Sequence, residues 1–333
     1  QEYIANRLGN LGIVASAKGD YDGALQLYQQ AIVIDEELGN TQSVARHIGN
    51  MGIEYHRKRD YQAAVTRFFK ALVIEQAMGN VRAEARLLGN CGAVYQDVGD
   101  FALAERCLAL ALQMDLAAGH RDAVARHSGN LALVFLRQGL WEQVERWVQP
   151  AITLMRQLHD LAHLVEYLLP AVQLALHDNR FTAAEQFLHE CLSLLEQQNR
   201  PDIHLPAAIL LLETQARQQT MPVTAVIKQL RTLLSDWPEA KDQAILYDAI
   251  WKLDPRQDEA RDKAAQFYAA EHTRFPHVLY RQRYQILTGI ELPPPPLPPP
   301  PGALPARPDL DELNRQLNDL AAAHANAHGR LLD

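Results

Sequence analysis

A unit of forty residues repeats along the first part of the chain. Its clearest mark is a Gly-Asn pair, which recurs at Gly9-Asn10, Gly49-Asn50, Gly89-Asn90 and Gly129-Asn130. A module of this length cannot bury two faces on its own, so neighbouring modules must stack to build a continuous core. The period therefore constrains the chain to an extended array of similar modules.

Each unit is predicted to hold two helices. The Gly19-Asp20 pair ends one helix and begins the next, because Gly tolerates positive φ at a helix C-terminus and Asp caps an N-terminus. Gly39, Gly79 and Gly119 end the second helix of their units. Between these marks, apolar residues recur three and four positions apart, which is the helical period. In the first unit they are Leu27, Tyr28, Ala31, Ile34 and Leu38.

This pattern resembles the tetratricopeptide repeat. In that family a Gly on helix A, an aromatic residue three positions later, and an Ala-aromatic-Ala set on helix B hold the hairpin together. The residues at these positions are Gly12, Gly52, Gly92 and Ala132, then Ala15, Tyr55, Tyr95 and Phe135, and then Ala24, Tyr28 and Ala31 with their equivalents. Ala15 and Ala132 depart from the pattern of the family. The forty-residue period is similar to that of kinesin light chains, of spindle adaptors with Leu-Gly-Asn repeats, and of bacterial signalling ATPases. The resemblance implies an all-α fold, a right-handed α-solenoid whose A helices line a concave wall.

We expect four regions along the chain. Residues 1–200 hold five tetratricopeptide-like repeats, and residues 201–290 hold degenerate helical repeats and a polar cap. Residues 291–308 form a polyproline linker, extended at about 3.1 Å per residue. Residues 309–333 form a C-terminal amphipathic helix with a short heptad seam.

A second resemblance involves the segment that ends in the first prolines. The sequence from Leu253 to Pro296 looks like the ends of bacterial multidomain signal transducers, in which an ATPase or nucleotide-cyclase part precedes a repeat array. The sequence also begins with Gln1 rather than Met. We therefore expect the chain to be part of a longer protein.

The amino-acid composition restricts the kinds of partner that the chain is expected to bind. The 333 residues are 48% hydrophobic and carry a formal net charge of −8. Nucleic acids and anionic membranes need a basic surface, so we expect neither as a partner. No apolar run is long enough to span a bilayer. Cys91, Cys107 and Cys191 lack metal-ligand spacing, so we interpret them as reduced core residues of a cytoplasmic protein.

The Asn of each Gly-Asn pair falls on the concave wall in the tetratricopeptide geometry. These four residues, called the Asn ladder below, are Asn10, Asn50, Asn90 and Asn130. An exposed Asn offers a donor and an acceptor, and can pair with the backbone of an extended peptide whatever its side chains. The matching positions contact bound peptides in the families that the chain resembles. The structural alternative is that each Asn caps or bridges neighbouring A helices.

An arginine lies one helical turn before three of these Asn residues, at Arg46, Arg86 and Arg126. Such a stripe could grip acidic partners through charge-assisted hydrogen bonds. An acid also lies eleven residues before each arginine, which favours a structural role. The predicted pairs are Asp35 with Arg46, Glu75 with Arg86, and Asp115 with Arg126. We expect these pairs to set the geometry between units, with ligand contact as a secondary role.

Other groove positions are expected near the C-terminal ends of the A helices. They differ between units, as positions that read a ligand would, although plain solvent exposure gives the same variation. They are His56, Arg57, Gln96, Asp97, Leu136 and Arg137.

The sequence carries no catalytic or cofactor motif. It lacks a GxxxxGK[ST] loop, a GxGxxG turn and a GxSxG elbow. His47 and His127 recur in register and are assigned to the repeat rather than to a metal. His324 and His328 lie four apart in the tail, which is only half a metal site, and solvated histidines are the preferred interpretation. We expect no enzymatic activity, no cofactor and no metal.

The sequence favours a protein–protein interaction module that binds an extended peptide or a partner helix in a concave groove. The alternative is a ligand-sensing regulatory scaffold of a larger bacterial signal-transduction enzyme. A third hypothesis is self-association through the C-terminal helix. The polyproline segment could dock in an aromatic-lined groove or serve as a plain spacer.

Overall fold

The structure is a computed structural model of the whole chain. It describes residues 1–198, 200–298, 302 and 304–329, with side chains of the last helix described up to residue 323. In this part of the chain it contains sixteen α-helices and no strand. The all-α class predicted from the helical period is confirmed.

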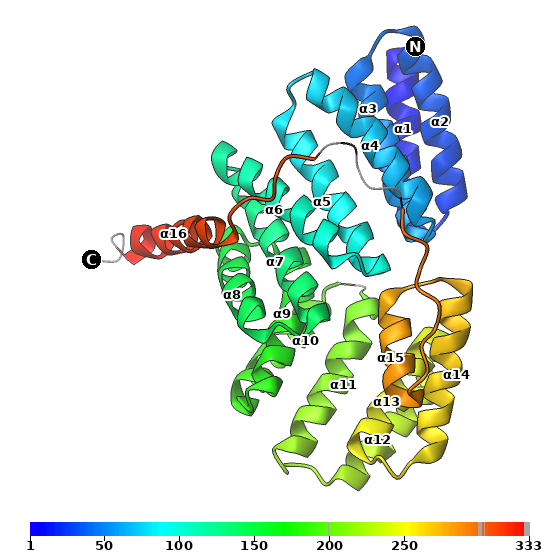
Figure 1. Cartoon of the computed structure of the whole chain (residues 1–333), viewed down its shortest axis with the longest axis vertical. Helices are drawn as coiled ribbons and strands as arrows, with labels where there is room; N and C mark the ends of the chain where they lie inside the picture. Colours follow the sequence, from blue (N-terminus) through cyan, green and yellow to red (C-terminus); the bar gives the residue numbers. More distant parts are fainter. Residues whose placement is uncertain (199, 299–301, 303, 330–333) are drawn as a thin grey trace. The chain divides into compact units, whose positions relative to one another are not determined.

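Two helices fall in each of the first five forty-residue units, in A–B order. The A helices are α1 (Glu2–Ala17), α3 (Thr41–Arg57), α5 (Val81–Val98), α7 (Arg121–Gln138) and α9 (Leu161–His177). The B helices are α2 (Tyr21–Glu37), α4 (Tyr61–Ala77), α6 (Phe101–Ala118), α8 (Trp141–Leu158) and α10 (Phe181–Leu195). The helices of each of the first three pairs pack side by side as a hairpin (Figure 1).

The chain forms two compact units. The first comprises Gln1–Asn130 and Pro295–Leu317, and the second comprises Leu131–Pro294 and the chain from Asn318 onward. The division falls within α7, so α1 to α6 and the first half of α7 belong to the first unit. The first unit therefore contains the whole Asn ladder.

The turns follow the predicted chemistry. Asp20, Asp60 and Asp100 cap the B helices of the first unit, each accepting a hydrogen bond from the backbone N–H three residues later at 2.9–3.1 Å. The preceding turn needs a left-handed residue, and Gly99 supplies it with φ of 88°. At the start of α8, Leu140 stands in the cap position and makes no side-chain hydrogen bond.

Small residues let the two helices of each hairpin approach closely. A Cβ added to Gly12 would lie 2.6 Å from Cε1 of Tyr28, and one added to Gly52 would lie 2.5 Å from Cε1 of Phe68. Both aromatic rings are almost fully buried. The Gly and aromatic positions predicted to hold the hairpins together are thus in contact.

Five further helices follow residue 200. They are α11 (Pro201–Arg217), α12 (Val223–Asp236), α13 (Ala240–Leu253), α14 (Asp258–Arg274) and α15 (Val278–Thr288). Leu230, Leu246 and Ile250 belong to their apolar core. A buried polar cluster accompanies it, in which Asp248 accepts two hydrogen bonds from the Arg283 guanidinium at 2.5 and 2.8 Å and one from Tyr268 at 3.3 Å.

The described residues of the proline-rich segment have no regular secondary structure, and Pro295, Pro298 and Pro308 are buried. The last helix, α16 (Leu310–Gly329), follows this segment, and Nε2 of Gln157 in α8 donates to the carbonyl of Ala321 in α16 at 2.9 Å. Its seam residues Leu313 and Leu317 are buried. The side chains of His324 and His328 lie outside the described residues.

Candidate functional site

The Gly of each Gly-Asn pair allows the next A helix to pack. A Cβ on Gly9 would lie 2.4 Å from Cε1 of His47, and a Cβ on Gly89 would lie 2.4 Å from Nε2 of His127. Real Cβ atoms do not come this close, so the neighbouring ring would have to move. The glycine of the pair is therefore a requirement of the fold.

The Asn ladder occupies equivalent positions on four successive A helices. Asn10 is exposed, and Asn50, Asn90 and Asn130 are half-buried. Within the described part of the chain, the side chains of Asn10, Asn50 and Asn90 make no hydrogen bond, which argues against the capping and bridging alternative at these three positions. Asn130 does have an interaction partner. Nδ2 of Asn90 is itself buried, and a buried donor without an acceptor costs about 1–3 kcal/mol.

Two of the arginines do not pair as predicted. Nη2 of Arg46 donates to Oδ1 of Asn6 on the preceding A helix at 3.3 Å. Arg126 pairs with an aspartate of its own helix at 3.4 Å. Neither contacts the acid eleven residues before it among the described residues, so the predicted pairs with Asp35 and Asp115 are wrong.

The residue after each arginine meets the acid instead. Nε2 of His47 lies 3.3 Å from Asp35, and Nδ1 of His127 lies 3.2 Å from Asp115, with all four side chains buried. Successive helical residues point about 100° apart, so a one-residue shift turns the arginine away from the acid. Burial and the charge of Arg46 lower the pKa of His47 below its usual value, while Asp35 opposes the shift. The assignment of both histidines to the repeat agrees with these contacts.

The third repeat differs because Leu87 replaces the histidine. Glu75 is buried and accepts a hydrogen bond from Nδ2 of Asn80 at 2.8 Å. Arg86 makes no hydrogen bond and no ion pair in the described part of the chain. Burial lowers the pKa of Arg86, and the charge of Glu75 opposes this shift. The predicted Arg86–Glu75 pair is thus reduced to a longer-range attraction, and the guanidinium remains without a partner.

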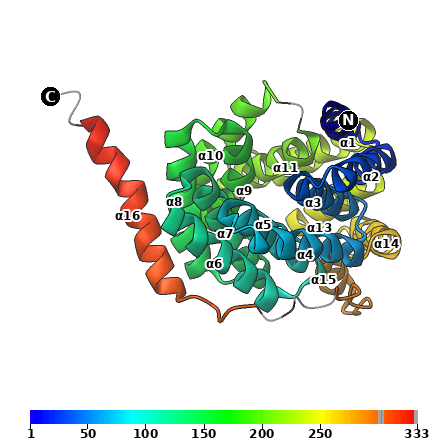
Figure 2. The same cartoon turned by 90° about the horizontal axis from the view of Figure 1, so that it is seen from above.

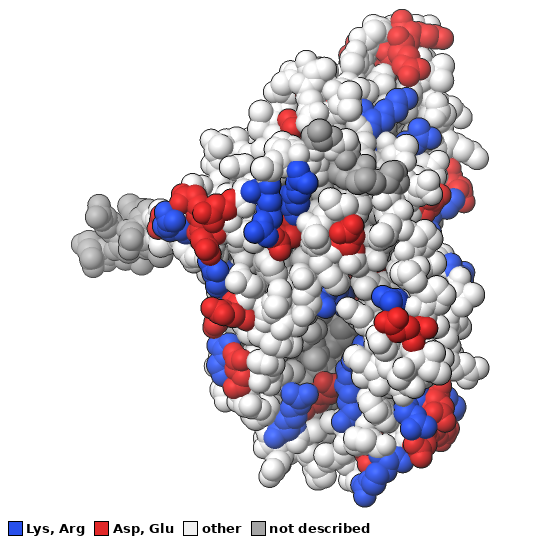
Figure 3. Space-filling model, in the orientation of Figure 1, with Lys and Arg blue, Asp and Glu red and all other residues white. Residues whose placement is uncertain are grey.

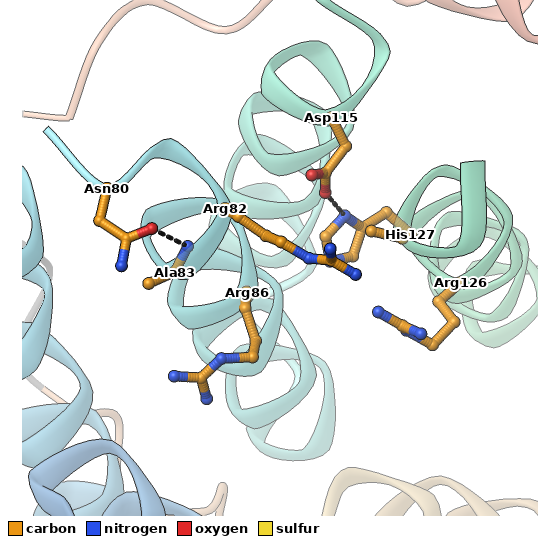
Figure 4. A pocket seen from close by; sticks show the side chains of 8 residues that line it. Asn80, Arg82, Ala83, Arg86, Asp115, Arg126 and His127 are labelled. Atoms are coloured by element: carbon orange, nitrogen blue, oxygen red, sulfur yellow. Dashed lines mark hydrogen bonds and ion pairs between the residues drawn. The ribbon is translucent and has the colours of Figure 1, made fainter. Parts of the chain in front are cut away.

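A cavity of about 230 Å³ is lined by residues of α5 and α7, Arg86 among them (Figure 4). Arg82 and Arg126 extend between the two helices, whereas the Arg86 guanidinium points away from α7, with Nη2 at 3.7 Å from the Cβ position of Gly49 on α3 (Figure 4). Arg82 and Arg126 share one carboxylate, that of Asp122, at 3.2 and 3.4 Å. The other lining residues are Asn80, Ala83, Asp115, Ala123 and His127. The cavity is therefore lined by arginine side chains from two A helices together with the carboxylate of Asp115.

The predicted residues at the C-terminal ends of the A helices make contacts between neighbouring helices. Nε2 of His56 lies 2.8 Å from Oδ2 of Asp97. Arg57 donates to Oγ of Ser16. These positions therefore have structural roles. Half-buried positions in the same set are Gln96, Leu136 and Arg137.

The sequence analysis missed Arg82 and Asp122. They are forty residues apart and pair across α5 and α7. Asn6 and Arg46 are also forty apart and in contact. Residues at the same repeat position thus face each other on neighbouring A helices, and opposite charges forty residues apart would have identified the pair.

On the face shown in Figure 3, acidic and basic side chains are interspersed. No cluster of three or more His, Cys, Asp or Glu side chains in the described residues is arranged to hold a metal. None of the helices described here has the length and apolar character needed to cross a membrane.

The family model of the tetratricopeptide repeat matches residues 3–74 and 83–157. These two segments cover most of the hairpins from α1 to α8, except chiefly the end of α4 and the start of α5. No curated protein matches the sequence.

Several solved structures have a similar fold. The apo form of RapI has a TM-score of 0.64 at 11% identity, and the match covers 85% of this chain and 99% of that one. The Rap conjugation gene regulator of plasmid pLS20, in complex with the Phr* peptide, has a TM-score of 0.59 at 16% identity, covering 84% and 75%. The apo quorum sensor NprR from B. thuringiensis has a TM-score of 0.51 at 12% identity, covering 86% and 87%. The fold is an α-solenoid of tetratricopeptide-type hairpins.

Proposed function

We propose that the A helices of residues 1–130 bind an extended peptide segment of a partner protein through the Asn ladder. The observation that carries the proposal is a row of side-chain amides without a partner: the side chains of Asn10, Asn50 and Asn90 make no hydrogen bond in the described residues. A row of amides offers donors and acceptors together. An extended backbone offers the complementary groups whatever its side chains are.

Arg86 gives the proposed ligand a charge preference. Arg86 has no anionic partner within hydrogen-bond distance among the described residues, and Arg82 and Arg126 share one aspartate. A carboxylate side chain of the peptide would give Arg86 a charge-assisted hydrogen bond, which is about twice as strong as a neutral one. The favoured ligand is therefore an extended peptide with an acidic residue placed beside Arg86.

A second candidate function is the sensing of a free peptide by a regulatory module of a bacterial signalling protein. A Rap regulator of similar fold was solved with the Phr* peptide, and another similar structure is that of a quorum sensor. Both candidates use the same surface and differ in where the peptide comes from. In either case we propose a non-enzymatic, cytoplasmic scaffold built from repeats of the forty-residue kind.

The direct test uses peptides selected on the full chain from a random display library. A selected peptide is labelled and titrated by fluorescence polarisation. The double variant Asn50→Ala/Asn90→Ala should weaken binding by about 1–3 kcal/mol, or roughly 5- to 150-fold, since each lost hydrogen bond contributes about 0.5–1.5 kcal/mol. The matched control is Gln29→Ala/Gln62→Ala, which removes two exposed amides from B helices and should leave the affinity unchanged.

Backbone recognition has its own test. Methylating the backbone nitrogens of the selected peptide keeps every side chain but removes the donors, so affinity should fall as it does in the Asn double variant. Replacing side chains other than the acidic residue should have little effect. Equal binding of the methylated peptide, or an unchanged affinity of the Asn variant with intact helicity by circular dichroism, would remove the Asn ladder from the mechanism.

A further inference from the structure

Helix α6 contacts the segment that precedes α16, and this contact does not involve the Asn ladder. The segment preceding α16 runs past α6 in both Figure 1 and Figure 2. Arg106 of α6 donates through Nε to the carbonyl of Pro305 at 2.9 Å. Its Nη2 donates to the carbonyls of Leu304 and Pro305 at 2.5 and 2.6 Å. One guanidinium thus holds two consecutive carbonyl groups.

The neighbouring residue of α6 contacts a side chain of the same segment. Glu105 pairs with Arg307, and the Glu105 side chain is only 14% exposed. Pro308, the next residue of the segment, is buried. Two carbonyls, an arginine and a proline are therefore contacted within the five residues Leu-Pro-Ala-Arg-Pro.

This mode of contact suits a proline-rich ligand. Proline has no N–H, so an extended proline-rich segment offers mainly carbonyl acceptors, and a guanidinium fork is a matching donor. The second compact unit holds the start of the segment with the same chemistry. There Arg281 donates to the carbonyl of Leu292 and His272 to that of Pro293, both at 2.8 Å.

The repeat itself does not require Glu105-Arg106. The same positions hold Leu25-Gln26 in α2 and Val65-Thr66 in α4. They hold Glu145-Arg146 in α8, where Glu145 pairs with Arg180. The residues of α6 are thus explained by the segment that they contact rather than by hairpin packing.

We propose that Glu105 and Arg106 form a binding site for extended proline-rich segments of the spacing Leu-Pro-x-Arg-Pro, which residues 304–308 occupy as an intramolecular ligand. A partner protein that carries this motif binds α6 when the chain's own segment is displaced. The site lies on a B helix, so this proposal does not depend on whether the A helices bind a peptide.

The test uses the full chain with its own segment weakened by Leu304→Gly, Pro305→Gly and Arg307→Gly, called the released variant. The probe is a labelled peptide with the sequence of residues 302–310, measured by fluorescence polarisation. The peptide should bind the released variant at least about tenfold more tightly than the unaltered chain, because an intramolecular ligand competes at high effective concentration. Adding Arg106→Gln should weaken binding at least about tenfold, and adding the matched change Arg146→Gln should not.

A charge exchange separates recognition from misfolding. In the released variant, Glu105→Arg should lose the normal peptide and gain a peptide in which the arginine is replaced by glutamate. Circular dichroism should report unchanged helicity in every variant. Equal binding to the released and unaltered chains, no binding to either, or binding indifferent to Arg106→Gln would overturn the proposal.

Discussion

The first three hairpins and the helices from α11 to α15 solve the same packing problem differently. In the hairpins, a few contacts recur every forty residues: a glycine under a large side chain, and a buried acid in contact with a polar side chain. In α11 to α15, Asp248, Arg283 and Tyr268 form a buried cluster with no counterpart forty residues away. In the repeats, many equivalent contacts together determine how the helices pack. In α11 to α15, a single buried cluster has this role.

The largest loss of stability is expected from a change in the buried cluster of Asp248, Arg283 and Tyr268. Asp248→Ala leaves the Arg283 guanidinium and the Tyr268 hydroxyl without their carboxylate, so the free energy of unfolding should fall by about 3–5 kcal/mol. Urea unfolding followed by circular dichroism measures this change. The control, Asp262→Ala, removes an exposed carboxylate that pairs with Arg261 and should cost no more than about 1 kcal/mol. Equal losses would mean that the cluster does not hold these helices together.

A smaller effect is expected from one of the repeated contacts. Gly52→Ala places a methyl group against the Phe68 ring, and such overpacking costs about 1–3 kcal/mol, offset by up to about 1 kcal/mol of helix propensity. Phe68→Leu in the same chain should relieve the contact, so the double variant should lose less stability than the two single losses added. Strict additivity would show that the two residues do not press on each other.

The buried histidine should make the hairpins sensitive to pH. The pKa of His47 is lowered in the folded chain, so the unfolded chain binds more protons and stability should fall as the pH drops below the usual value of 6.5. The loss for one proton cannot exceed about 1.4 kcal/mol per pH unit. His47→Leu copies the Leu87 of the next repeat and should flatten the profile between about pH 7.5 and 5.5. Parallel profiles for the two chains would contradict this assignment.

The smallest predicted effect is a gain of stability at the start of α8. Leu140 has φ and ψ of −87° and 71°, close to the −83° and 74° of Asp20, but it offers no capping oxygen. Leu140→Asp should therefore cap α8 and raise the free energy of unfolding by about 0.5–1 kcal/mol in urea titrations. Leu140→Asn serves as a neutral comparison, because it caps without a charge. A loss of stability with both would show that this turn depends on the exposed leucine.

The sequence predicted those features of the fold that the period repeats. The hairpins and their turns follow from counting along the chain, and the contact of Gly52 with Phe68 agrees with what the resemblance to the tetratricopeptide repeat implies. The predicted Arg46–Asp35 pair failed because a separation of eleven residues does not show which face of the A helix is turned toward the preceding B helix, and His47 rather than Arg46 faces Asp35.

Other features of the structure could not be predicted from the sequence of one repeat alone. The cavity that Arg86 lines is formed by residues of two neighbouring A helices and of the B helix between them. Likewise, Arg283 and Asp248 lie 35 residues apart, a separation that no repeat duplicates. The role of the Asn ladder in binding a peptide stays a prediction.

The composition of the proline-rich segment also affects whether the chain would aggregate if the segment detached. Ten of its eighteen residues from 291 to 308 are proline, so more than half of them have no backbone N–H. Another polypeptide needs a row of such donors to add itself as a β-strand. Once detached from α6, the segment would therefore be a hydrated tether that cannot seed aggregation.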